Sequence, residues 1–323
     1  MKEESTAAEI LTRAPDRDAF RAHVRAGFRA PQKWLSPMYL YDQRGSELFE
    51  AICELPEYYP TRTETAILQA HSSEIAEAVG PQALVMEPGS GSGSKTRMLL
   101  EMLDDPVAFV PVEISRDYLE ESVPKLQTAF PQLEILGVHG DFRESFDIPA
   151  SRRPARRRLI FFPGSTIGNF MEDEAVHLLD QLRRQAGPNG AMLIGVDLRK
   201  DPGILERAYD DARGVTAAFN LNLLERMNRE LGTDFDPSRF RHQALWNEAD
   251  SRIEMHLVSQ CPQTVHLDEL TIPFQTGESI LSECSHKFSE AGFARMAERA
   301  GWRVARTWSD AQAWFSLQYL VSP

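Results

Sequence analysis

Three glycines alternate with serines within residues 87–96, where an apolar run ends and a helical pattern begins. Such glycines allow a tight strand-to-helix turn, and backbone N–H groups at the helix start can hold a nucleotide-like ligand. The dinucleotide pattern G-x-G-x-x-G and the phosphate loop G-x-x-x-x-G-K-[ST] both require glycine at position 94, which is Ser94. Because Gly89, Lys95 and Thr96 otherwise fit the phosphate loop, an ATP-using enzyme is one alternative.

A third pattern, E/D-x-G-x-G-x-G, is matched in full by residues 87–93. Class I S-adenosylmethionine methyltransferases carry this loop, so the match favours a methyl donor. An ordinary strand–helix turn is the alternative for the loop taken alone, and the rest of the chain must decide between them.

Polar side chains follow the next three apolar runs. Glu113 lies 20 residues beyond Gly93, where nucleotide-binding α/β folds place the acid that accepts hydrogen bonds from a ribose. Asp141 and Phe142 suit an adenine amino group and an adenine ring, although Asp141 equally suits a helix cap. Asn169 lies where a substrate amine or carboxylate would sit beside a cofactor, or where asparagine stabilises a turn.

Other residues could line a small-molecule pocket. Tyr41, Tyr58 and Tyr209 are aromatic with a polar tip, but tyrosines in a core are equally common. Glu283 and Ser285 offer an acid and a hydroxyl that could recognise an imidazole, or they belong to a solvated loop. Neither the cysteines nor the histidines show metal-ligand spacing, so we expect no metal.

Apolar runs alternate with helical patterns through the first two thirds of the chain. The predicted strands are Ala83–Glu87, Phe109–Glu113, Leu133–Val138, Leu159–Phe162 and Met192–Asp197. The predicted helices between them are Lys95–Leu103, Arg116–Phe130 and Asp173–Gln185. This alternation indicates a parallel sheet covered by helices on both faces.

The rhythm changes on both sides of that region. Thr61 and Glu64 form a capping-box pattern, which predicts that a helix opens at Thr61. Residues 200–235 are predicted as helix and residues 252–257 as a half-buried antiparallel strand. Helix Ser289–Ala300 and strands Trp302–Trp308 and Ala313–Leu320 then close the parallel sheet. We therefore predict a sheet domain of residues 61–199 and 288–323, split by an inserted α+β domain of residues 1–60 and 200–287.

Composition narrows the possible partners. The chain has 323 residues and a formal net charge of -13, which argues against nucleic acid as the main partner. No run approaches the ~18 apolar residues of a membrane helix, and the first residues lack a signal-peptide pattern. With three cysteines and no heptad pattern, we expect a cytoplasmic monomer that associates with no membrane.

Four longer motifs give the chain a specific resemblance. They are residues 41–46 (YDQRGS), 55–64 (LPEYYPTRTE), 164–169 (GSTIGN) and 219–222 (FNLN). At these residues, and from about Lys33 onward, the sequence resembles the L-histidine Nα-methyltransferases of ergothioneine biosynthesis. The resemblance implies a class I S-adenosylmethionine methyltransferase (Rossmann-like) sheet with a substrate-binding domain. It implies transfer of three methyl groups from S-adenosylmethionine to the α-amino nitrogen of L-histidine, giving hercynine and S-adenosylhomocysteine.

The resemblance also implies a role for individual residues. The expected cofactor contacts are Gly89, Lys95, Glu113, Asp141 and Phe142. The expected histidine contacts are Tyr58, Asn169, Tyr209, Glu283 and Ser285, with Met255 shaping the ring pocket and Tyr41 near the reacting amine. Relatives that methylate an indole amino acid are expected to lack Glu283, so an indole substrate is the second alternative. Tyr41 and Asn169 are the expected catalytic residues, with Tyr41 a weak candidate base because a tyrosine pKa is ~10.

Overall fold

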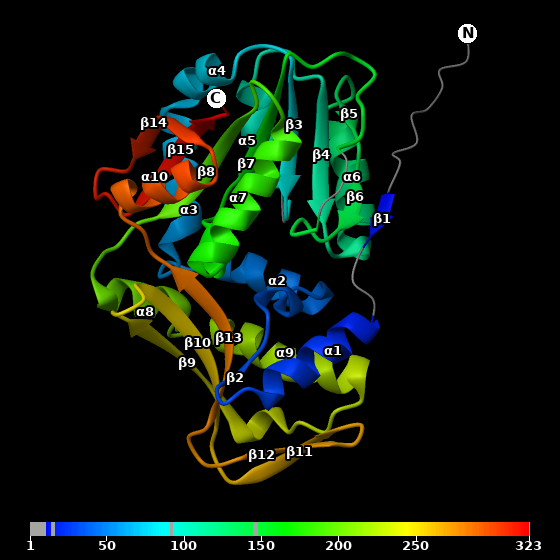
Figure 1. The fold of residues 1–323 in the computed structure, drawn as a ribbon, viewed down its shortest axis with the longest axis vertical. Helices are drawn as coiled ribbons and strands as arrows, with labels where there is room; N and C mark the ends of the chain where they lie inside the picture. Colours follow the sequence, from blue (N-terminus) through cyan, green and yellow to red (C-terminus); the bar gives the residue numbers. More distant parts are fainter. Residues whose placement is uncertain (1–10, 14–16, 91–92, 145–147, 323) are drawn as a thin grey trace.

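The computed structural model describes residues 11–13, 17–90, 93–144 and 148–322. Two sheets organise these residues, a larger one in the upper half of Figure 1 and a smaller one in the lower half. The glycine loop is described only in part, because Gly91 and Ser92 lie outside the described residues.

The larger sheet contains the predicted parallel strands. Its order is β1-β6-β4-β3-β7-β8-β15-β14, with β5 beside β4, and every pairing is parallel except those of β15 with β8 and β14. Its strands are β1 (Leu11–Arg13), β3 (Ala83–Pro88), β4 (Ala108–Glu113), β5 (Glu134–Ile135), β6 (Val138–Gly140), β7 (Arg157–Phe162), β8 (Ala191–Asp197), β14 (Arg303–Ser309) and β15 (Phe315–Val321). β3, β4 and β8 are buried along their whole length, as apolar strands between two helix layers must be.

Helices cover both faces of this sheet. One face packs against α3 (Tyr59–Ala70), α4 (Ser72–Val79), α5 (Ser94–Met102) and α6 (Arg116–Ala129). The other face packs against α7 (Glu172–Ala186) and α10 (Glu290–Arg299). The predicted fold class is confirmed in these layers, including the antiparallel final strand.

The smaller sheet has the order β2-β13-β10-β9, and a separate hairpin of β11 and β12 lies below it in Figure 1. Its strands are β2 (Lys33–Trp34), β9 (Phe240–Asn247), β10 (Arg252–Ser259), β11 (Gln263–Leu267), β12 (Leu270–Phe274) and β13 (Ser279–His286). The helices beside it are α1 (Arg17–Arg29), η1 (Pro37–Leu40), α2 (Gln43–Cys53), α8 (Pro202–Tyr209), α9 (Val215–Leu231) and η3 (Pro237–Arg239). One hydrophobic core joins side chains from 20–59 with side chains from 205–280, so distant segments share this half.

Three local expectations differ from the structure. Residues 200–235 form α8 and α9, because Gly214 takes a left-handed conformation (φ 72°) and the Asp211 carboxylate caps the start of α9. The helix predicted to open at Thr61 begins at Tyr59, so the capping box is wrong and the Glu64 carboxylate is used elsewhere. β1 pairs with β6, which places Leu11–Arg13 in the larger sheet. The full division into two domains stays a prediction.

The two halves meet where η2 (Thr166–Asn169) lies against β13. Gly168 allows this approach, because a Cβ there would lie 2.8 Å from the backbone oxygen of His286. The His286 ring nitrogen Nδ1 also bonds to the Gly168 carbonyl at 2.8 Å. Among the helices described, none is long and apolar enough to cross a membrane.

Candidate active site

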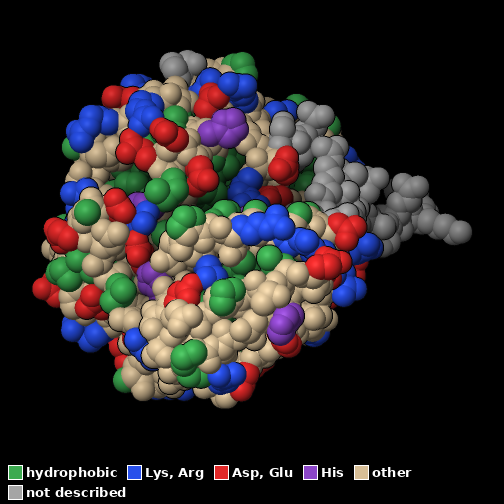
Figure 2. All heavy atoms as spheres, turned by 60° about the horizontal axis from the view of Figure 1, so that its bottom comes forward, with side chains coloured by type: hydrophobic (Ala, Val, Ile, Leu, Met, Phe, Trp, Pro, Cys, Tyr) green, Lys and Arg blue, Asp and Glu red, His purple; other side chains and the backbone are tan. Residues whose placement is uncertain are grey.

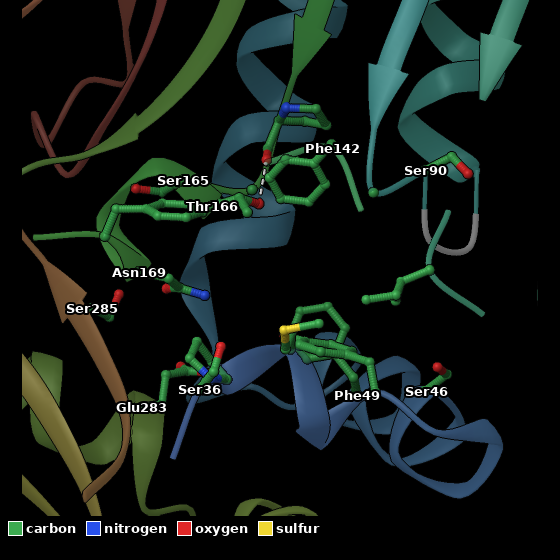
Figure 3. Close-up of a pocket in the computed structure, with 18 of the residues that line it drawn as sticks. Ser36, Ser46, Phe49, Ser90, Phe142, Ser165, Thr166, Asn169, Glu283 and Ser285 are labelled. Atoms are coloured by element: carbon green, nitrogen blue, oxygen red, sulfur yellow. Dashed lines mark hydrogen bonds between the residues drawn. The ribbon is translucent and has the colours of Figure 1, made fainter. Parts of the chain in front are cut away.

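A cavity of about 1580 Å³ lies between the two halves of the molecule. Figure 2 shows a hollow across the middle of one face, with hydrophobic side chains in its depth. Figure 3 shows Asn169, Glu283 and Ser285 on the left of the cavity, and Phe142 and Ser90 toward its upper right. The residues predicted to contact cofactor and substrate therefore face one space.

The start of the glycine loop lies on one wall of the cavity. Gly89 is left-handed (φ 69°), and its N–H donates to the Val112 carbonyl at 2.8 Å, which ties the loop to β4. The Ser90 hydroxyl beside it is buried, and no residue in the described ranges pairs with it. An unpaired buried hydroxyl facing a cavity fits a polar ligand group, such as those of S-adenosylmethionine.

Glu113 ends β4 at the same wall. Its Oε1 accepts hydrogen bonds from the backbone N–H of Ile114 at 2.8 Å and of Ser115 at 3.2 Å, so the carboxylate is held in place. The carboxylate lies at the wall of the cavity, where its acceptor oxygens suit ribose hydroxyls. The arrangement fits the role predicted for Glu113.

Asp141 and Phe142 follow β6 and line the cavity. Arg143 bonds both Asp141 oxygens through Nε at 2.9 Å, an ion pair that the sequence did not indicate. The Phe142 ring packs edge-on against Phe162 with centroids 5.8 Å apart. A Cβ at Gly89 would lie 3.6 Å from this ring, so Phe142 lies directly beside the loop.

Lys95 has a protein partner that sequence reasoning missed. Its Nζ lies 2.5 Å from Oε2 of Glu64, which is fully buried on α3. Glu64 also accepts from the backbone N–H of Gly164 at 2.9 Å. A Cβ at Gly195 would lie 2.1 Å from Glu64, so this glycine leaves the space that the carboxylate needs. The ion pair thus connects α3, the glycine-loop helix and the loop after β7.

Strand β13 supplies the predicted imidazole contacts. Glu283 and Ser285 are two residues apart, so the strand's alternation points both side chains to one face. Asn169, at the end of η2, reaches the same region from the larger sheet. The Tyr209 hydroxyl lies 2.8 Å from Ser285 Oγ, which adds α8 to the group.

Burial shifts the pKa values of the acid and tyrosines in this region. Burial raises the pKa of Glu283 to about 7, and the positive charge of Lys287 opposes that rise. Burial, followed by the charge of Glu283, raises the pKa of Tyr41 well above its usual value. Burial also raises the pKa of Tyr58 well above its usual value. Both tyrosines therefore keep their protons at neutral pH, and neither is a competent base.

Met255 is not among the residues that line the cavity. It is 2% exposed and pairs across the strands with Glu283. Directly opposed residues on neighbouring strands share a face, so Met255 can act on the pocket only by packing beside Glu283. The remaining predicted contacts all line the cavity: Tyr41, Tyr58, Gly89, Lys95, Glu113, Asp141, Phe142, Asn169, Tyr209, Glu283 and Ser285.

A buried charge cluster beneath the substrate side was also missed. Asp197, at the end of β8, lies 2.5 Å from Lys200 Nζ and 2.8 Å from Lys287 Nζ. Tyr59 donates to the same carboxylate at 2.7 Å. Burial would raise the pKa of Asp197, but the two lysines outweigh it and hold that pKa below its usual value. Two lysines surround one carboxylate, so these three groups carry a net positive charge.

The FNLN motif forms hydrogen bonds that hold two segments lining the cavity. Asn220 donates to a ring nitrogen of His242, whose other ring nitrogen bonds to the backbone oxygen of Tyr209 at 2.8 Å. Asn222 donates to Asp42 at 2.8 Å, and Asp42 caps the start of α2 directly after Tyr41. The motif therefore positions two tyrosines of the cavity, which only the tertiary contacts reveal.

Comparisons with known proteins identify the family. The model of the family described as histidine-specific methyltransferase, SAM-dependent, matches residues 20–322. The chain is 43% identical to a histidine N-alpha-methyltransferase of Mycolicibacterium smegmatis, covering 94% of this chain and 95% of the relative. It is 42% identical to the protein of that name from Mycobacterium tuberculosis, covering 93% and 94%.

Among solved structures, a possible exported protein from Bordetella parapertussis is similar in fold alone. It has a TM-score of 0.51 and 10% identity, with 96% of this chain and 97% of that chain covered. The family match spans both halves of the molecule and every predicted site residue. The chain belongs to the histidine-specific, S-adenosylmethionine-dependent methyltransferases.

Proposed function

We propose that the protein transfers three methyl groups to the α-amino nitrogen of L-histidine, forming hercynine and S-adenosylhomocysteine in the first step of ergothioneine biosynthesis. The observation that carries this proposal is that Glu283 and Ser285 face the cavity that Gly89 and Glu113 also line. The groups proposed to recognise the imidazole nitrogens and the groups proposed to bind adenosine therefore line the same cavity.

Each substrate contact has a distinct task in this proposal. Asn169 and Tyr209 hold the α-carboxylate through an amide N–H and a hydroxyl. Glu283 accepts from one ring nitrogen, and Ser285 bonds the other. Tyr58 closes the pocket, its ring 6.0 Å from that of Tyr209. Met255 sets the position of Glu283 from the neighbouring strand, which supports the expected influence on the ring pocket.

In this proposal the cofactor is bound by Gly89, Glu113, Asp141 and Phe142. Lys95 acts indirectly, by tying the glycine loop to Glu64. S-adenosylmethionine, when bound, supplies an electrophilic methyl group on a sulfonium. The residues therefore need only align the histidine amine with that group at near-attack distance. No covalent enzyme intermediate is required.

The amine must lose a proton before each attack. Tyr41 lies beside the cavity with its ring edge-on to Phe49 and Phe219, both with centroids 5.5 Å away. Because its pKa is raised, Tyr41 orients the amine as a hydrogen-bond partner and does not remove the proton as a base. Water in the open cavity then carries the proton away.

Calorimetry and product analysis test the proposal together. L-histidine should bind to the complex with S-adenosylhomocysteine, and mass spectrometry after turnover should find trimethylated histidine. A product that stops at one methyl group, or turnover of L-tryptophan in preference to L-histidine, would refute it. Binding of Mg-ATP in place of the cofactor would support the phosphate-loop alternative. We also propose that the enzyme is a cytoplasmic monomer, which light scattering and cell fractionation test.

A further inference from the structure

Lys287 lies directly after β13, and its side chain is fully buried. Its Nζ lies 2.9 Å from the Tyr209 hydroxyl, 2.7 Å from Ser285 Oγ and 2.8 Å from Asp197 Oδ2. An ammonium has three N–H donors and no acceptor. All three donors are therefore used, and both hydroxyl oxygens accept a hydrogen bond from Lys287.

Each of the two hydroxyls must also donate its own hydrogen bond to an acceptor. Tyr209 and Ser285 lie 2.8 Å apart, so one of them donates to the other and one proton remains. Both residues line the cavity, so that proton is available to a ligand there. When histidine separates the pair, the Tyr209 hydroxyl donates to the α-carboxylate, as proposed above, and the Ser285 hydroxyl donates to the ring nitrogen. In both arrangements Lys287 occupies one acceptor site on each hydroxyl oxygen, so fewer acceptor sites are left for a ligand.

The protonation states support this arrangement. Burial raises the pKa of Tyr209, with Lys287 opposing, so the phenol keeps its proton at neutral pH. Burial would lower the pKa of Lys287, but its attraction to Asp197 and Tyr209 outweighs burial and holds that pKa above its usual value. The ammonium and both hydroxyls are present together.

We propose that Lys287 is a positioning residue that makes the Tyr209–Ser285 pair a proton-donating surface, so that the pocket selects a ring with one acceptor nitrogen and one N–H. The inference rests on the proposed function, because Glu283 supplies the acceptor for that N–H. A neutral imidazole satisfies both sides. An indole or pyrrole ring has an N–H but no acceptor nitrogen, and would leave the buried donor unpaired.

Lys200 offers a matched control within the same cluster. Its Nζ also bonds Asp197, together with Tyr59 and the Leu198 carbonyl. No hydrogen bond to Tyr209 or Ser285 is found for Lys200 in the described part of the chain. Removing either lysine leaves one cation for one carboxylate, so Lys287→Met and Lys200→Met keep the same charge balance.

The test compares kcat/KM for L-histidine and for the two pyrrolylalanines, in which C–H replaces one or the other ring nitrogen. We expect the wild-type enzyme to disfavour the pyrrole whose N–H faces Glu283 and whose C–H faces the Tyr209–Ser285 pair by about 10³-fold relative to L-histidine. Lys287→Met should narrow this ratio to about tenfold, because the freed hydroxyls no longer have to donate. Lys200→Met should keep the wild-type ratio. A wild-type ratio in a folded Lys287→Met variant would overturn the proposal.

A measurement on the wild-type enzyme keeps the proposal testable if Lys287→Met does not fold. Nitrogen-15 NMR of ring-labelled L-histidine, bound with S-adenosylhomocysteine, should show one protonated and one unprotonated ring nitrogen. Two protonated nitrogens would overturn it. Failure of the proposed function is separate, because it would appear as a wild-type enzyme that does not methylate histidine at all.

Discussion

The cofactor side and the substrate side of the cavity are built differently. Gly89, Glu113 and Asp141 come from the ends of three neighbouring parallel strands, and backbone N–H groups hold Glu113 in place. Asn169 and Glu283 come from segments far apart in the chain, which meet only because η2 packs against β13. Sheet topology alone places the first group, whereas the second depends on the contact between the two halves.

The electrostatic settings differ as well. The cofactor side presents acidic side chains to the cavity, including buried Glu87. Burial raises the pKa of Glu87 to about 8, although a hydrogen bond from Thr96 opposes the rise, so Glu87 is mostly neutral at pH 7. Beneath the substrate side lie two lysines around Asp197. A net positive charge there suits the carboxylate of an amino acid. Changes on one side should therefore leave the function of the other largely intact.

Glu283→Ala should have the largest effect on this comparison. The variant leaves a ring N–H of histidine without its acceptor, so we expect kcat/KM for histidine to fall by up to ~10⁴-fold. The Kd of S-adenosylhomocysteine, measured by calorimetry, should change by less than about twofold, since Glu283 lies on the other side. Glu283→Gln keeps the shape of the side chain and serves as the matched variant. An unchanged kcat/KM for histidine in Glu283→Ala would contradict the proposed role of Glu283 in substrate selection.

Gly168→Ala tests whether the junction positions the substrate side. The added Cβ would meet the His286 backbone at 2.8 Å and push η2 away from β13. A misplacement of about 1 Å costs on the order of 10²-fold in rate, so kcat/KM for histidine should fall by about that factor. The Kd of S-adenosylhomocysteine should stay at its wild-type value. An equal loss of both would show that the two sides are not independent.

Glu113→Gln addresses the cofactor side. A hydrogen bond to a charged group contributes about 1.5–3 kcal/mol, so S-adenosylhomocysteine should bind about 10- to 100-fold more weakly. The ratio of kcat/KM between histidine and its pyrrole analogues should stay at its wild-type value. If that ratio collapsed, Glu113 would have to influence the ring pocket across the cavity.

The pH dependence of histidine binding should be a smaller, sign-specific effect. The Glu283 pKa is raised to about 7, so the acid is mostly protonated at pH 6 and ionised at pH 8. The ionised form accepts the ring N–H, so affinity should rise by about fivefold from pH 6 to pH 7 and by about tenfold from pH 6 to pH 8, and then level off. Titration calorimetry with the S-adenosylhomocysteine complex measures this. Glu283→Gln should lack that rise, and retention of the rise would assign it to another group.

Much of the cofactor side was predictable from local patterns. Continuous apolar runs followed by helices require a parallel sheet, and the carboxyl ends of parallel strands meet at one edge. Glu113 and Asp141 were expected at that edge for this reason, and both line the cavity. The partners of Lys95 and Asp141 were not predictable, because Glu64 is 31 residues away and Arg143 has several other possible contacts.

The capping box shows how a local rule fails. Thr61 and Glu64 have the right spacing, but the helix begins two residues earlier at Tyr59. Glu64 then points inward to Lys95 and Gly164, in space that Gly195 leaves open. The Glu64 carboxylate therefore forms a tertiary ion pair with Lys95 and does not cap the helix.

The sequence by itself determined the parallel sheet, the glycine loop and the family resemblance, because these depend on residue types at short, regular spacings. Only the tertiary structure decided that Lys287 donates to both Tyr209 and Ser285 while bonding Asp197, some 90 residues earlier in the chain. Short-range periodicity carries no record of which distant side chains share a buried site. Burial forces those groups to satisfy one another, and that requirement sets the hydrogen-bonding pattern offered to the substrate.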